Sequence, residues 1–190
     1  MNYLAISGLR IIEESEATGE TAELYDKGKR LMEMPFVPNS AKVIAVSPPI
    51  LEAVMNLYHV FYQKLNLPQS LLAVISYAIP TAKNCRYCSA NQELYCRVVG
   101  IDEETLAKVA QDLGNVSPER VKIVVEFALK CALEPQSLVA EDYDRVRDQG
   151  VSDEELIEII YVASLANFSD TLADASKINV DDMVAQALRH

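Results

Sequence analysis

The chain has 190 residues, half of them apolar and 24% charged, which is an ordinary composition for a globular protein. This length allows one domain with a substantial core, which would bury roughly 70% of the surface of the unfolded chain. The net charge of −11 disfavours nucleic acid and anionic membranes as partners, because their phosphate groups would repel this surface.

Helix signals begin soon after the N-terminus. Thr18 or Thr21 precedes an acidic first turn, which leads into a helix ending near residue 31. The short Pro-rich stretch 34–39 is expected to be a packed connection, not a linker. Ser47 and the two prolines after it start a helix over residues 50–65, in which apolar residues recur at three- and four-residue steps. This spacing predicts one buried face.

A more apolar helix is expected over residues 71–82. Pro80 lies within it and should kink or end it, because proline lacks an N–H group and clashes with the preceding turn. A new helix should then start with Asn84 as its cap. This start would put Cys85 at the first helical position and Cys88 at the fourth.

Four further helices are expected from similar capping signals, and these begin after Asp102, Ser117, Ser152 and Asn179. They should end near residues 114, 133, 165 and 188. The signal at Ser152 is the strongest, because Glu155 follows it at the spacing of a capping box. No stretch shows sustained alternation of apolar and polar residues. The sequence therefore predicts an all-α protein.

The most reactive groups are the two thiols of the run Cys85-Arg86-Tyr87-Cys88. Thiols at this spacing can close a disulfide across one helical turn, and the free N–H groups of a helix start favour a thiolate. A thiol pKa of about 8.5 leaves about 3% thiolate at pH 7, whereas a pKa of 6.5 would give about 75%. Lys83 and Arg86 are the cations in range. We therefore expect a lowered thiol pKa and redox chemistry at sulfur, with Tyr87 lining a pocket.

Residues 84–90 (Asn-Cys-Arg-Tyr-Cys-Ser-Ala) resemble the thiol motif of AhpD-like alkylhydroperoxidases in the carboxymuconolactone decarboxylase superfamily. Segments 36–39, 47–52, 150–155 and 166–175 resemble the peroxidase-related branch of that superfamily, in the same order along the chain. The resemblance implies a single AhpD-like helical bundle over residues 1–190, with the thiol motif at 84–92.

The same resemblance implies roles for the two thiols. By motif position, Cys88 would attack a hydroperoxide and become a sulfenic acid, and Cys85 would resolve it to a disulfide. A thioredoxin- or lipoyl-type reductant would restore the thiols. Hydroperoxides or disulfides would be the substrates, no cofactor or metal is implied, and relatives of this kind form homo-oligomers.

The chain departs from the motif where the family has its proton relay. That relay uses a glutamate twelve residues before the first cysteine and a histidine four residues after the second, and these positions hold Ala73 and Gln92. Asn91, where relatives often carry histidine, does not titrate either. Because general acid–base catalysis typically contributes about 10²–10⁴-fold, we expect a slow peroxidase or a disulfide-exchange protein.

Other interpretations remain open. The thiol pair could be two unreactive core residues, or part of a zinc site with Cys96 and Cys131. The latter two, in apolar helical surroundings, are expected to be inert packing residues, and His59 a structural one. A decarboxylase is disfavoured because no matching histidine is present. The main alternative is a non-catalytic helical protein that senses redox state or binds a partner.

The compartment follows from signals that the chain lacks. The first ten residues show no basic start followed by an apolar segment, so no secretion signal is predicted. The longest apolar runs, around residues 71–80 and 159–168, are too short to span a bilayer. Unpaired cysteines such as Cys96 are unusual in secreted proteins. We expect a cytoplasmic protein with no membrane association.

Overall fold

Ten α-helices and three short 3₁₀ helices make up residues 7–189, the part of the chain that the computed structural model describes. No strand occurs in this part, which confirms the all-α prediction. The α-helices are α1 (Gly19–Met32), α2 (Asn39–Ile44), α3 (Pro48–Gln63), α4 (Gln69–Lys83), α5 (Arg86–Val98), α6 (Glu103–Gln111), α7 (Glu119–Leu133), α8 (Ala140–Arg147), α9 (Asp153–Ser176) and α10 (Asp182–Ala187). The 3₁₀ helices are η1 (Glu14–Glu16), η2 (Leu113–Asn115) and η3 (Pro135–Ser137).

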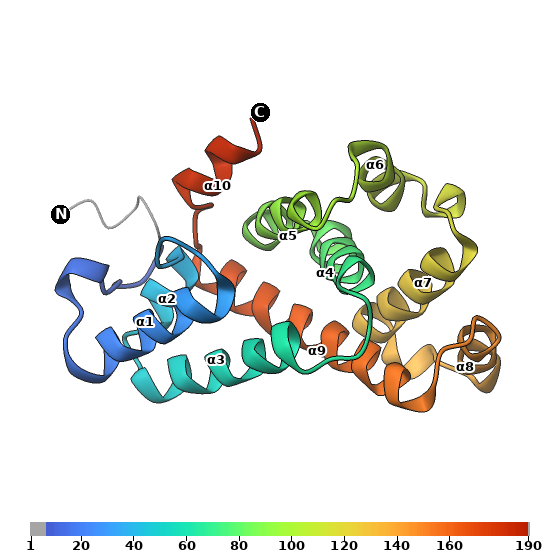
Figure 1. Ribbon diagram of the computed structural model, residues 1–190, viewed down its shortest axis with the longest axis horizontal. Coiled ribbons are helices and arrows are strands. Elements are labelled where there is room, and N and C mark those ends of the chain that lie inside the picture. Colours follow the sequence, from blue (N-terminus) through green and yellow to red (C-terminus); the bar gives the residue numbers. More distant parts are fainter. Residues whose placement is uncertain (1–6, 190) are drawn as a thin grey trace.

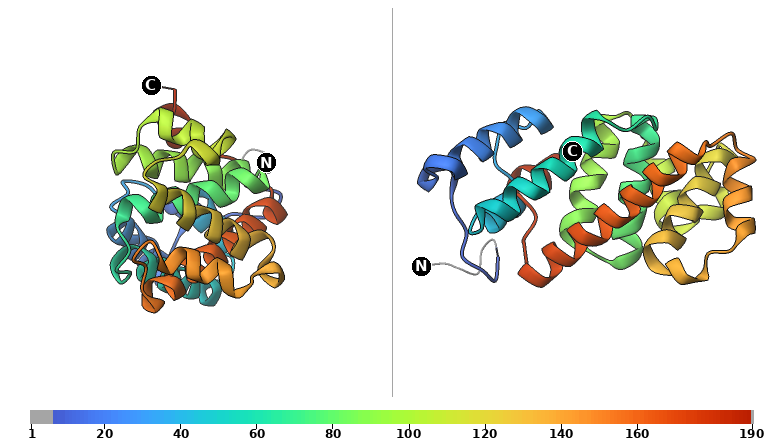
Figure 2. Two further views of the ribbon diagram at one scale, coloured as in Figure 1. Left: turned by 90° about the vertical axis from the view of Figure 1, so that its right-hand side faces the viewer. Right: turned by 90° about the horizontal axis from the view of Figure 1, so that it is seen from below.

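Helix α4 is the centre of the bundle and packs against α5, α7 and α9 (Figure 1). It is apolar on all sides, and Leu72, Ile75 and Ile79 have no exposed surface. Helix α9 runs along much of the length of the molecule (Figure 2). Helices α1, α2 and α3 form a smaller apolar cluster at one end. Because the end of α4 is packed in the main apolar core, the joint between α4 and α5 has a fixed position.

This α4–α5 joint differs from the sequence prediction by one residue. Helix α4 continues past Pro80 to Lys83, so termination at the proline was wrong. Asn84 has φ 60, in the left-handed region that asparagine tolerates. The Asn84 N–H donates to the Thr81 carbonyl and the Cys85 N–H to the Pro80 carbonyl, which is a Schellman ending of α4. Asn84 therefore closes α4, and Cys85, not Asn84, is the N-cap of α5.

The capping predictions are confirmed where the capping side chain directly precedes its own helix. The Ser152 side chain accepts from the Glu155 N–H, and Glu155 accepts from the Ser152 N–H, as a capping box requires. Asp102 caps α6 by accepting from Thr105 N–H. Other boundaries were misplaced: α6 ends at Gln111, the N-caps of α7 and α10 are one and two residues later than expected, and α9 continues to Ser176.

Helices α2 and α8 were not anticipated. The first N–H of α2, on Asn39, donates to Oδ1 of Asp181 at 2.8 Å, so this helix start is completed by a residue from the other end of the chain. Of the stretch 34–39, which was expected to be a packed connection, only the last residue, Asn39, belongs to α2. The contact that completes the start of α2 is a tertiary contact, and no local sequence pattern reveals it.

Helix α9 is long and apolar enough to cross a membrane by length and composition alone, although each uninterrupted apolar run is short. Inside the fold, 44% of its most apolar window is buried, against α4, α5 and α7. This packing is that of a core helix. It also brings the C-terminal part of α9, which holds Asp170, close to the start of α5.

Candidate functional site

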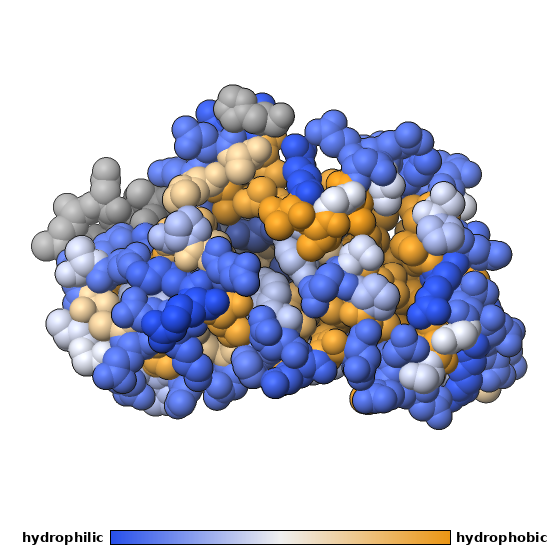
Figure 3. Space-filling view, in the orientation of Figure 1, coloured by the Kyte–Doolittle hydropathy of each residue, from blue (hydrophilic) through white to orange (hydrophobic). Residues whose placement is uncertain are grey.

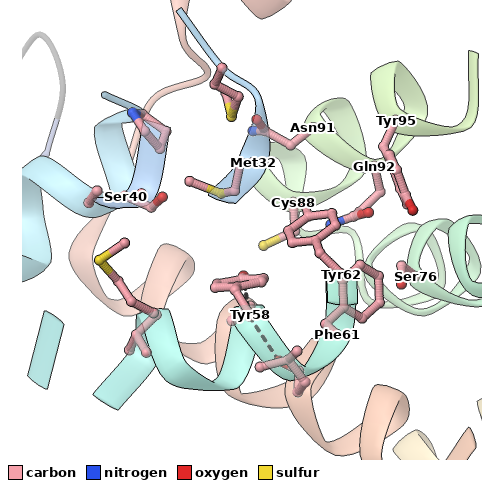
Figure 4. A pocket seen from close by; sticks show the side chains of 18 of the residues that line it. Met32, Ser40, Tyr58, Phe61, Tyr62, Ser76, Cys88, Asn91, Gln92 and Tyr95 are labelled. Atoms are coloured by element: carbon pink, nitrogen blue, oxygen red, sulfur yellow. Dashed lines mark hydrogen bonds between the residues drawn. The ribbon is translucent and has the colours of Figure 1, made fainter. Parts of the chain in front are cut away.

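A partly open cavity of about 500 Å³ lies between α1, α3 and α5 (Figure 4). Its walls are mainly apolar and aromatic, and the residues that line it include Met32, Met55, Tyr58, Phe61, Tyr62, Tyr87 and Tyr95. Apolar surface is exposed over the middle of the molecule, around α4 and α5, between hydrophilic margins (Figure 3). The cavity is therefore suited to an apolar organic group.

Cys88 is one of the cavity-lining residues, and its sulfur points into the open space toward Tyr58 (Figure 4). Its exposed fraction is 8%, whereas Cys85 is fully buried and does not line the cavity. The two side chains share a small cluster with Val43 and Ala173. A molecule in the cavity can therefore reach Cys88 first, with Cys85 behind it.

The second sequence-predicted thiol is close enough to react with the first. The sulfurs of Cys85 and Cys88 and a carboxylate oxygen of Asp170 all lie within 4.8 Å of one another. Both cysteines are free thiols in this state. The structure therefore brings together the two predicted site residues and adds one acid, and we refer to these three side chains as the thiol–carboxylate group.

Asp170 is the candidate site residue that the sequence analysis did not single out. It comes from α9, its exposed fraction is 1%, and Lys83 Nζ lies 3.2 Å from Oδ2. Lys83 also donates to Oδ1 of Asn167 at 2.7 Å. Within residues 7–189 neither oxygen of Asp170 has a well-directed hydrogen-bond donor. The only signal in the sequence was one acid at the end of a long apolar stretch.

The expectation of a lowered thiol pKa was wrong for Cys88. Hydrogen bonding to Cys85, burial and the negative charge of the Asp170 carboxylate raise the pKa of Cys88 well above its usual range. Lys83 is paired with Asp170, and Arg86 is exposed. The helix-start N–H groups of α5 are therefore outweighed by the hydrogen bond to Cys85, by burial and by the Asp170 carboxylate.

The positions of the family's relay hold no titrating group. Ala73 is fully buried in the main core. Gln92 lines the cavity, and its buried Oε1 has no donor among the described residues. Asn91 donates to the Tyr87 carbonyl at 2.9 Å. Gln92 can therefore accept a hydrogen bond from a molecule in the cavity but cannot exchange a proton with it.

The remaining candidates lie outside the thiol–carboxylate group. Cys96 is fully buried in the main core, and burial raises its pKa to about 12. Cys131 is half-buried, and burial raises its pKa to about 11. Neither belongs to a cluster of metal ligands in the described part of the chain, so the four-cysteine zinc site is not assembled. His59 is half-buried on α3 and does not line the cavity.

Tyr87, expected to line a pocket, does so and also fixes the start of α5. Its hydroxyl donates to Oδ2 of Asp181 at 3.1 Å and accepts from the Ser40 N–H at 3.1 Å. Asp181 also holds α2 through Asn39. This buried network ties α2 and α5 to Asp181, the N-cap residue of α10.

Known proteins resemble this chain in fold. No family model matches the chain, and no curated protein sequence matches it. Solved structures do match. A peroxidase-related protein with an alkylhydroperoxidase AhpD core from Ralstonia eutropha JMP134 is 19% identical, with a TM-score of 0.85 and 94% of each chain covered. A peroxidase-related protein from Silicibacter sp. TM1040 is 17% identical, with a TM-score of 0.80 and 96% of this chain and 97% of that chain covered.

The debrominase Bmp8 is also similar, at 16% identity and a TM-score of 0.80, with 100% of this chain and 98% of that chain covered. A cysteine-to-alanine variant of that enzyme is in complex with 2,3,4-tribromopyrrole. At these identities the likeness concerns the fold. The chain has the AhpD-like fold of these peroxidase-related proteins.

Proposed function

We propose that the protein is a thiol oxidoreductase that reduces organic hydroperoxides through Cys88 and Cys85. The observation that carries this proposal is the arrangement of the thiols. Cys88 faces an apolar cavity, and Cys85 lies directly behind it. A thiol that meets a substrate and a second thiol that can trap the oxidised product are the two parts that such a cycle needs.

The cycle has three steps. The Cys88 thiolate attacks the outer oxygen of the hydroperoxide, the O–O bond breaks, and a sulfenic acid and an alcohol form. The Cys85 sulfur then attacks the Cys88 sulfur, and a disulfide and water form. An external dithiol of the thioredoxin or lipoyl type reduces the disulfide and is itself oxidised. A cytoplasmic location, where such reductants are available, is part of this proposal.

The cavity favours a hydroperoxide with an apolar organic group over hydrogen peroxide. Burial of about 100 Å² of apolar surface contributes roughly 2.5 kcal/mol, which corresponds to a preference of about 70-fold. The unpartnered Oε1 of Gln92 can accept the hydroperoxide O–H near Cys88. We therefore expect cumene hydroperoxide to react faster than hydrogen peroxide.

The test is a thiol count after treatment with one equivalent of cumene hydroperoxide. The wild type should lose two of its titratable thiols, Cys88→Ser should lose none, and Cys85→Ser should lose one and hold a sulfenic acid. Cys96→Ser is the matched control and should still lose two. Unchanged thiol counts in the wild type would contradict the proposal.

A second candidate function is reductive dehalogenation of a small aromatic compound. The aromatic wall of the cavity beside Cys88 favours it, together with the likeness to a debrominase. Here the Cys88 sulfur would take the halogen, the aromatic carbon would take a proton, and Cys85 would displace halide to give the same disulfide. Release of bromide from a bromopyrrole, with loss of two thiols, distinguishes this reaction from peroxide reduction.

The alternative of a non-catalytic redox sensor makes a different prediction. A sensor would also form the disulfide, but it would not consume hydroperoxide repeatedly when a dithiol reductant is supplied. Hydroperoxide consumption with dihydrolipoamide therefore separates the two. More than ten turnovers per chain supports the enzyme, and a single turnover supports the sensor.

A further inference from the structure

The proposed reaction requires proton transfers that the thiols cannot complete alone. Cys88 must lose a proton before it attacks, and the departing alkoxide must gain one. Ala73 and Gln92 occupy the positions of the usual relay and cannot titrate. The cavity-lining carboxylates in the described part of the chain are Glu33 and Asp170. Glu33 is exposed, whereas Asp170 is buried within 4.8 Å of both sulfurs.

We infer that Asp170 is the catalytic base and acid of the thiol pair, an assignment that rests on the proposed function. Three observations support it. An oxygen of Asp170 lies within 4.8 Å of the sulfurs of Cys85 and Cys88, and the exposed fraction of Asp170 is 1%. Neither of its carboxylate oxygens has a well-directed hydrogen-bond donor in residues 7–189. A structural carboxylate buried to this degree is normally saturated with hydrogen bonds. The oxygen of Asp170 that lies within 4.8 Å of both sulfurs is within reach of a proton from either thiol.

The groups that face Asp170 come from three elements. Lys83 of α4 lies 3.2 Å from Oδ2 and supplies the positive charge that allows a buried carboxylate. Cys85 and Cys88 lie at the start of α5. From α3, Tyr58 faces both Cys88 and Asp170, and burial raises the pKa of its hydroxyl to about 12, so it stays protonated. Asp170 is therefore the carboxylate in this set, and a carboxylate oxygen can accept a proton from a neighbouring thiol.

The proton balance closes in both halves of the reaction. The Cys88 thiol gives its proton to Asp170, sulfur bonds to the outer oxygen of the hydroperoxide, the O–O bond breaks, and the alkoxide leaves as an alcohol with that proton. The Cys85 thiol then gives its proton to Asp170, its sulfur bonds to the Cys88 sulfur, the S–O bond breaks, and hydroxide leaves as water with that proton. Asp170 ends each half-reaction ionised.

The test compares Asp170→Asn with Asp174→Asn, a matched change at an exposed aspartate on the same helix. Two rates are measured at pH 7: thiol oxidation by cumene hydroperoxide, which needs a proton donor for the alkoxide, and alkylation of Cys88 by iodoacetamide, which needs only the thiolate. Asp170→Asn should slow oxidation by about 10²-fold or more. It should slow alkylation much less, because alkylation shares the deprotonation of Cys88 but releases iodide, which needs no proton. Asp174→Asn should change neither rate.

Two results would overturn the assignment while leaving the proposed function intact. If both rates rise together in Asp170→Asn, the carboxylate acts only as a charge. If both fall by the same factor, Asp170 does not protonate the departing alkoxide, and its assignment as the catalytic acid is wrong. If the wild-type protein is alkylated but is not oxidised by hydroperoxide, that result contradicts both the proposed function and this assignment.

If circular dichroism shows that Asp170→Asn does not fold, a measurement on the wild type decides. General acid catalysis by Asp170 predicts that the oxidation rate depends little on the acidity of the departing alcohol across a series of hydroperoxides. A rate that rises steeply with that acidity means that the alkoxide leaves without a proton, and it overturns the assignment.

Discussion

Cys88 lines the cavity, and the pKa of its thiol is raised. Many reactive cysteines lie near cations that lower the thiol pKa. At Cys88 hydrogen bonding to Cys85, burial and the Asp170 carboxylate raise the thiol pKa, and the half-buried cation Lys83 is paired with Asp170. In such a site the thiol rests protonated and is activated when a base takes the proton in the presence of substrate.

The raised pKa of Cys88 leads to a pH prediction. Alkylation of Cys88 by iodoacetamide should be slower at pH 7 than alkylation of a free thiol. It should keep rising above pH 9 without a plateau, because the thiolate fraction is still small there. Rates measured by mass spectrometry from pH 6 to 10 in Cys85→Ser and in the wild type check this. The pKa of Cys88 should be lower in Cys85→Ser, and a plateau near pH 7 in the wild type would contradict the account.

At this scale the sequence revealed the two thiols but not their environment. The spacing of Cys85 and Cys88 places both at one helix start, which is a local property. Asp170 reaches them only because α9 packs beside α4 and α5, and no local pattern encodes that contact. The error in the pKa has the same origin: the helix start was visible in the sequence, whereas the buried carboxylate was not.

The α4–α5 joint is the element that sets the thiol geometry. It depends on the left-handed conformation of Asn84 and on the two Schellman hydrogen bonds behind it. Local predictions succeeded where a cap lies within its own helix, as at Ser152, and failed where the partner is distant. Pro80 was misjudged because burial on all sides of α4 holds the helix together beyond the proline.

Asn84→Ala should therefore destabilise the protein by about 1 kcal/mol, because alanine disfavours the left-handed region. Asn84→Gly should be nearly neutral. Lys177, the C-cap of α9 with φ 56, is the matched site, and Lys177→Gly should stabilise by about 1 kcal/mol. Free energies of unfolding from urea titrations check all three. Equal stabilities for Asn84→Ala and Asn84→Gly would contradict the role given to this residue.

The whole molecule keeps several acidic protons away from water. Burial raises the pKa of Cys96 to about 12 and that of the Tyr58 hydroxyl to about 12. In the unfolded chain such groups ionise near about 8.5 and about 10. Above these pH values the folded state holds protons that the unfolded state has lost, so stability must fall as the pH rises.

The free energy of unfolding should accordingly be level near pH 7–8 and fall between about pH 9 and 12. Each group that ionises only in the unfolded state contributes about 1.4 kcal/mol per pH unit across its window. Urea unfolding at steps from pH 7 to 11 measures how the free energy of unfolding changes with pH. In Cys96→Ala this change should be smaller by the contribution of one thiol. A stability that rises above pH 9 would contradict the assigned burial.

At the scale of the molecule, the fold class was predictable because helix periodicity and caps recur along the entire chain. The cavity was not, because its walls come from α1, α3, α5 and α9, and the sequence does not show which faces of these helices meet. The central claim concerns what happens at this cavity: Cys88 and Cys85 act as one redox unit.

The most direct test of that claim is mass spectrometry of the protein after one equivalent of cumene hydroperoxide, followed by digestion without reduction. The account predicts a loss of two hydrogens, confined to the peptide that holds Cys85 and Cys88, and its reversal by a dithiol. Oxidation found instead at Cys96 or Cys131, or spread over methionines with the 85–88 peptide unchanged, would contradict it.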